Sequence, residues 1–66
     1  GIKEEENLTE EEKIILKIIE KEPIHIDKIC KLSKMTAGQV LSTVSLLEIK
    51  DIIKNISGKF TAIKWN

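Results

Sequence analysis

The sequence predicts a small α+β domain with three helices and a short sheet of two or three strands. Two predicted helix starts carry the capping-box spacing, in which Ser or Thr precedes Glu or Gln by three residues: Thr9 with Glu12, and Thr36 with Gln39. Near the C-terminus, two runs rich in β-branched and aromatic residues flank a glycine, the pattern of a hairpin. At 66 residues, the chain is long enough for one such domain with a modest core.

The first helix is predicted from about Glu10 to Lys21. Behind the Thr9 cap, one broad apolar stripe is formed by Ile14, Ile15, Ile18 and Ile19. Pro23 ends this helix, because the residue before a proline is disfavoured in the helical region. Residues 1–8 are polar and charged and show no period, so we expect a flexible acidic lead-in before a domain that spans residues 9–66.

The second helix follows a short extended piece, Ile24 to Ile26, which we expect to pair as an edge strand with the later hairpin. Asp27 opens this helix as its N-cap or in its first turn, where a carboxylate is favoured. Ile29 and Cys30 are its inward positions, and Leu32 ends it. The turn that follows is Ser33 to Met35, with Met35 expected to fill the core.

The third helix, Thr36 to Lys50, organises the rest of the chain. Its core-facing positions are predicted from three-to-four residue spacing and are Val40, Val44 and Leu47.

The hairpin is predicted from Ile52–Ile56 and Phe60–Trp65, joined by a turn at Ser57-Gly58-Lys59. The full order is helix, strand, two helices and two strands. This is the order of a winged helix-turn-helix, in which the third helix is the recognition helix and the hairpin is the wing.

The net charge of zero conceals an asymmetry along the chain. Residues 1–12 hold one lysine and six glutamates, a net charge of −5, whereas residues 13–66 hold ten lysines and five acids, a net charge of +5. All eleven basic residues are lysines, so bidentate recognition of bases or phosphates by a guanidinium is excluded.

The sequence offers no case for secretion or membrane insertion. A single cysteine makes no internal disulfide, and no apolar run reaches the ~20 residues that span a bilayer. We expect a cytoplasmic domain. Because the chain does not begin with Met and has no signal pattern, we expect a piece of a longer protein.

The sequence also gives no catalytic set. His25 is the one histidine and Cys30 the one cysteine, with no cluster at metal-ligand spacing, so we expect no enzyme, metal or cofactor. His25 is interpreted as a structural residue near a helix start, and Cys30 as a small buried apolar residue.

Nucleic-acid binding is the first functional hypothesis, because the early turns of a recognition helix point at base edges. Gln39 has the groups to read adenine, and serine or threonine to contact bases or phosphates. The candidate DNA contacts are Lys34, Thr36, Gln39, Ser42, Thr43, Lys54 and Lys59, with Lys50 as a further phosphate candidate. The helix carries no positive charge between Thr36 and Ile49, so binding would be weak, salt-sensitive and largely non-specific. The alternative is a solvated polar surface with scattered lysines.

Protein contact is the second functional hypothesis. At about 100° per residue, Leu46 and Ile49 fall opposite the core-facing positions of the third helix. Two exposed branched residues one turn apart predict a small contact patch, for a protein partner or for self-association. In the alternative, Ile49 packs against the first helix or the hairpin.

Several of these residues resemble a known module. Pro23-Ile24-His25-Ile26-Asp27, Val40, Leu47-Glu48-Ile49-Lys50, Ile52-Ile53 and Gly58 are similar to the C-terminal winged helix of the DprA/Smf family, the DNA-processing proteins of bacterial natural transformation. The resemblance covers nearly all of the chain from Leu8 onward. Two positions depart from the family's glycines: Lys34 in the turn and Asp51 after the third helix.

The resemblance implies a role as an accessory to DNA uptake and recombination, within a full-length chain that carries a DprA-like core. That core binds single-stranded DNA and helps to load the recombinase RecA in the family. Its binding residues match no position here, so only the winged-helix role carries over. The alternative is the DNA-binding winged helix of a transcription regulator.

Overall fold

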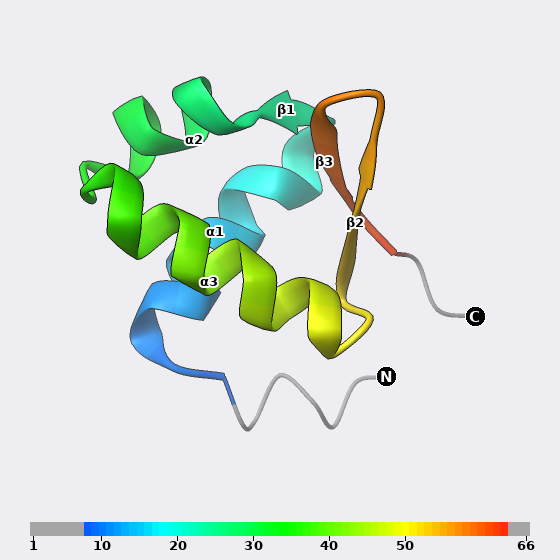
Figure 1. Ribbon diagram of the computed structural model, residues 1–66, viewed down its shortest axis with the longest axis horizontal. Coiled ribbons are helices and arrows are strands. Elements are labelled where there is room, and N and C mark those ends of the chain that lie inside the picture. The colour runs from blue at the N-terminus through cyan, green and yellow to red at the C-terminus, as the bar shows by residue number, and fades with distance from the viewer. Residues whose placement is uncertain (1–7, 64–66) are drawn as a thin grey trace.

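The computed structural model describes residues 8–63 and contains three helices and one three-stranded sheet (Figure 1). The elements are α1 (Glu10–Lys21), β1 (Ile24–His25), α2 (Ile26–Ser33), α3 (Ala37–Ile49), β2 (Ile53–Ile56) and β3 (Lys59–Ala62). Helix α3 crosses the front of the molecule, α1 lies behind it, and the β2–β3 hairpin stands at one side (Figure 1). The predicted winged-helix architecture is therefore confirmed.

Both predicted capping boxes are present. In α1, the Thr9 hydroxyl accepts from the Glu12 amide at 3.2 Å, and the Glu12 carboxylate accepts from the Thr9 amide at 2.8 Å. In α3, the Thr36 hydroxyl accepts from the Gln39 amide at 3.1 Å, and the Gln39 side-chain oxygen accepts from the Thr36 amide at 3.0 Å. Each box satisfies two backbone donors that a helix start leaves without partners.

The core lies between the three helices and the sheet. Its buried apolar residues are Leu8, Ile15, Leu16, Ile19, Ile24, Ile29, Val40, Val44, Leu47, Ile52, Ile53 and Phe60. The predicted stripe of α1 is corrected in two places, because Ile14 is exposed and Leu16 is buried. Cys30 and Met35 pack against the core but are only half-buried. Leu8, expected as the last residue of the lead-in, is buried in the core, and residues 1–7 lie outside the described part.

Helix α2 begins at Ile26, the last residue of the predicted extended piece, and of the two placements predicted for Asp27 the first turn is confirmed. This start leaves His25 at the N-cap of the helix. The strand before it is correspondingly short, and it pairs antiparallel with β3, with Ile24 opposite Phe60. The predicted edge strand is thus confirmed, at two residues in length.

The hairpin forms the wing of the domain. Strand β3 lies between β1 and β2, and Ile56 of β2 pairs with Lys59 of β3 across a two-residue turn. Ser57 and Gly58 have φ of 53° and 88°, the pair of positive values that a type I′ turn requires. The Asn55 side-chain oxygen accepts from the Gly58 amide at 3.0 Å, which stabilises the turn. Trp65, expected at the end of the second strand, lies outside the described residues.

Lys34 and Asp51, the two positions that depart from glycine, both adopt left-handed backbone, with φ of 62° and 61°. Asp51 ends α3 in a Schellman motif, in which its amide donates to the Glu48 carbonyl and the Ile52 amide to the Leu47 carbonyl, each at 3.0 Å. Left-handed backbone costs an ordinary side chain energy, and aspartate tolerates it better than lysine.

Replacing Lys34 with glycine is expected to raise the free energy of unfolding by about 0.5 to 1 kcal/mol, because relief of the left-handed backbone exceeds the added freedom of the unfolded chain. Asp51→Gly is the matched comparison and should give a smaller gain. Urea unfolding followed by circular dichroism measures both. A loss of stability in Lys34→Gly would contradict this account of the turn.

Candidate functional site

The solvent side of α3 is the most unusual surface among the described residues. Val40, Val44 and Leu47 are buried as predicted, so the opposite side of the helix faces solvent. We call this side the outer face of α3; it consists of Gly38, Leu41, Ser42, Ser45, Leu46 and Ile49. Three of these residues are large aliphatics, exposed by 54% (Leu41), 48% (Leu46) and 78% (Ile49). The single charged residue within the helix is Glu48. The outer face is therefore apolar and small-polar, without positive charge.

The polar residues at the start of α3 are already engaged with one another. The Gln39 side-chain oxygen accepts from both the amide and the hydroxyl of Thr36, at 3.0 and 3.2 Å. Bidentate recognition of adenine needs the amide oxygen as well as the amide nitrogen. Gln39 would therefore have to leave the capping box to read a base in this way, and Thr36 would lose its partner.

Thr43, one of the candidate DNA contacts, does not face solvent. Its side chain is buried, and its hydroxyl donates to the Gln39 carbonyl at 2.7 Å. This bond to the preceding turn turns the hydroxyl away from solvent, so Thr43 supports α3 from within. Of the two neighbouring candidates, Ser42 is the exposed one and belongs to the outer face.

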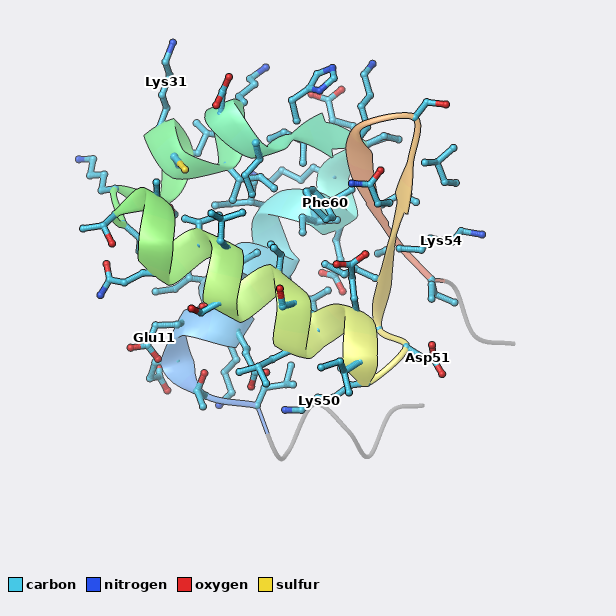
Figure 2. The ribbon with its side chains drawn as sticks, in the orientation of Figure 1. Glu11, Lys31, Lys50, Asp51, Lys54 and Phe60 are labelled. Carbon is cyan, nitrogen blue, oxygen red and sulfur yellow. The ribbon has the colours of Figure 1, made fainter. Side chains whose placement is uncertain are left out.

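The candidate lysines are exposed but lie on separate elements. Lys34 occupies the turn before α3, Lys54 lies on β2 and Lys59 on β3. None of the three lies within 4.0 Å of a carboxylate among residues 8–63. In Figure 2, Lys54 projects from the wing, while Lys31 of α2 projects from the opposite side of the molecule. Lys54 and Lys59 lie on the two paired strands of the wing, whereas Lys34 lies in the turn before α3.

Lys50, the further phosphate candidate, is paired inside the domain. Its ammonium donates to both carboxylate oxygens of Glu12, at 3.1 and 3.0 Å. Glu12 is only 1% exposed. Burial acts to raise the pKa of Glu12, but the hydrogen bond from the Thr9 amide and the nearby Lys50 ammonium together hold this pKa below its ordinary value. The ammonium of Lys50 therefore stabilises the fold by neutralising the buried carboxylate of Glu12.

The remaining candidates for chemistry do not gather into a site. His25 is exposed at the N-cap of α2 and makes no side-chain capping bond. Within residues 8–63, no three His, Cys, Asp or Glu residues lie close enough together to hold a metal ion. In the same part of the chain, each helix is too short or too polar to cross a bilayer.

Leu41 is the residue of the outer face that sequence reasoning missed. It lies at the edge of the predicted core side, next to Val40, so its spacing alone leaves its direction open. A signal was nevertheless present. Ser45 and Glu48 follow Leu41 by four and seven residues, on the same row of the helix, and both are polar. A row that continues into polar residues faces solvent, as the exposure of Leu41 shows.

Comparison with known protein families identifies the family of this domain. The family model of the DprA winged helix domain matches residues 3–59. No curated protein and no solved structure matches the chain.

Proposed function

Because the chain belongs to the DprA winged helix domain family, we propose that it is a non-catalytic docking module, accessory to DNA uptake and recombination in the cytoplasm. It acts by protein contact through the outer face of α3, within a full-length chain that carries a DNA-binding core. Weak contact between the lysines and duplex DNA is secondary. The family match favours this role over that of a transcription regulator.

The composition of the outer face is the observation that carries the proposal. Leu41, Leu46 and Ile49 lie on the solvent side of a single helix, and Glu48, at the edge of this side, is the one charged residue of that helix. Single exposed leucines are common on protein surfaces, but three large aliphatics exposed on one short helix are typical of a contact surface.

The electrostatics of α3 argue against DNA as its main target. Release of counterions, which drives non-specific DNA binding, needs basic groups at the phosphates, and α3 offers none along its outer face. The face ends instead at two exposed acids, Glu48 and Asp51. The capping box also occupies the groups of Thr36 and Gln39 that would read bases.

The proposal predicts opposite results for two variants in a transformable bacterium whose DprA carries this domain. Leu46→Glu should lower transformation at least severalfold, because a carboxylate would be desolvated on docking. Lys54→Glu combined with Lys59→Glu should leave transformation nearly unchanged. Leu32→Glu, on a leucine of α2 with similar exposure, is the matched control for the added charge.

Duplex binding is measured separately, by fluorescence anisotropy with labelled DNA at low and at physiological salt. Binding at low salt should be weak and should vanish as salt rises. If the lysine variant abolishes transformation and Leu46→Glu does not, DNA contact is the function and the docking proposal fails.

A further inference from the structure

We propose that the outer face of α3 docks against the same face of a second copy of this chain, with the two helices antiparallel. This inference rests on the proposed function and names the partner that the docking surface takes.

The spacing of the outer face suits a two-helix seam. Its central line is Gly38, Ser42, Ser45 and Ile49, at successive steps of four, three and four residues, which is the alternation along a helix-pair seam. An antiparallel partner places Ser42 opposite the second copy's Ser45, and Gly38 opposite its Ile49. Leu41 and Leu46 flank this line on its two sides and cover its edges.

The sizes of the opposed residues are complementary. Ile49 is the most exposed large apolar side chain among the described residues, at 78%. The opposed Gly38 leaves room for this side chain: a Cβ added there would meet nothing within 4 Å, so packing inside the domain does not require a glycine. Glycine disfavours helix relative to alanine by about 1 kcal/mol. In the antiparallel pair, Gly38 has a structural role, because it makes room for Ile49 of the second copy.

The charges at the two ends of α3 are also complementary in this orientation. Lys34 is exposed in the turn before the helix, and Glu48 and Asp51 are exposed at its end. Lys50, the basic residue between these acids, is already paired with Glu12. An antiparallel pair brings opposite charges together and opposes the two helix dipoles. A parallel pair would place like charges side by side.

The interface is small. A helix of 13 residues is about 20 Å long, so one helix pair falls in the smallest class of protein interfaces. The isolated domain should therefore dimerise weakly, at high concentration. A longer chain that held two copies together would raise the effective concentration of the faces.

Sedimentation equilibrium between low micromolar and about 1 mM protein tests the association. The wild-type chain should show a mass that rises with concentration, and Leu46→Glu should weaken the association more than about tenfold. Leu32→Glu, at a similarly exposed leucine of α2, should associate like the wild type. A wild-type chain that stays monomeric at the highest concentration overturns the proposal, as does a Leu32→Glu variant that weakens association equally.

Disulfide exchange tests the orientation. In a Cys30→Ser background, Gly38→Cys and Ile49→Cys chains are mixed in a glutathione redox buffer. The antiparallel pair predicts disulfides between the two variants above the statistical share, and little cross-linking of either variant alone. Both positions are exposed, so the domain should still fold. Cross-linking of each variant with itself, or a purely statistical mixture, would refute the antiparallel pair.

The two proposals fail separately. Loss of transformation in Leu46→Glu from a chain that is strictly monomeric keeps the docking function and rejects the second copy as partner. Dimerisation without any effect of Leu46→Glu on transformation keeps the antiparallel pair and rejects the proposed function.

Discussion

Replacing Leu47 with alanine is expected to lower the free energy of unfolding by about 3 kcal/mol, whereas the same change at Leu46 should alter it by less than about 0.5 kcal/mol. Leu47 is fully buried between α3 and the rest of the core, so its removal leaves a cavity. Leu46, the next residue in the chain, lies on the outer face and is half exposed.

The size of this effect is decisive for so small a domain. At about 0.05 to 0.15 kcal/mol per residue, total stability is only several kcal/mol, so Leu47→Ala should be partly unfolded near 37 °C. Thermal and urea unfolding of both variants, followed by circular dichroism, measures the difference at dilute concentration, where self-association does not contribute. Equal losses at the two positions would show that α3 is rotated from the orientation described.

Replacing Lys50 with methionine is expected to cost about 2 kcal/mol, because it leaves the carboxylate of Glu12 buried without its ammonium partner. The estimate is below that for a fully buried pair, since the Lys50 side chain is 33% exposed and partly screened by water. The double variant Glu12→Gln, Lys50→Met is the control. Its neutral amide keeps the capping-box geometry, as Gln39 does in α3, so it should be more stable than Lys50→Met alone.

The same pair makes stability depend on pH. The pKa of Glu12 is lower in the folded than in the unfolded chain, so the contribution is fully present above the unfolded value and is lost as pH falls through the folded one. Unfolding free energies between about pH 6 and pH 3 should therefore decrease more steeply for the wild type than for Glu12→Gln. Parallel curves for the two proteins would show that Glu12 does not titrate as described.

Most of the fold is predictable from sequence because the residues that begin and end its helices and strands are close together in the chain. The first residues of α1 and α3 are specified by capping boxes, whose side chains lie within three residues of each helix start. Pro23 ends α1 because its ring disfavours helical backbone at the residue before it. The wing follows from the two-residue turn that Gly58 permits. The sequence predicts less well which side chains of α1 face the core, because isoleucines occupy much of the helix. Packing against α2 and α3 decides that Leu16 is buried and Ile14 is exposed.

The roles of the candidate site residues are harder to predict, because the same side chains can either stabilise the helix or contact a partner. Thr36 and Gln39 are suited both to capping and to reading bases, and the structure shows them capping. Thr43 is compatible with either side of the helix until its hydroxyl is seen to bond the Gln39 carbonyl. Leu46 and Ile49 were predicted on the outward side of the helix, where they lie. The exposure of Leu41 was not predicted and is seen in the structure.

The Glu12 carboxylate joins two segments that lie 38 residues apart, since it accepts from the Thr9 amide and from the Lys50 ammonium at once. Helix ends normally fray, and amides there exchange with solvent almost as fast as in a free peptide. If the first turn of α1 unwinds, Glu12 moves away and Lys50, the C-cap residue of α3, loses its ion pair. Amide hydrogens at the two ends should consequently exchange as one cooperative unit, which makes the start of the domain and the end of its longest helix a single opening event.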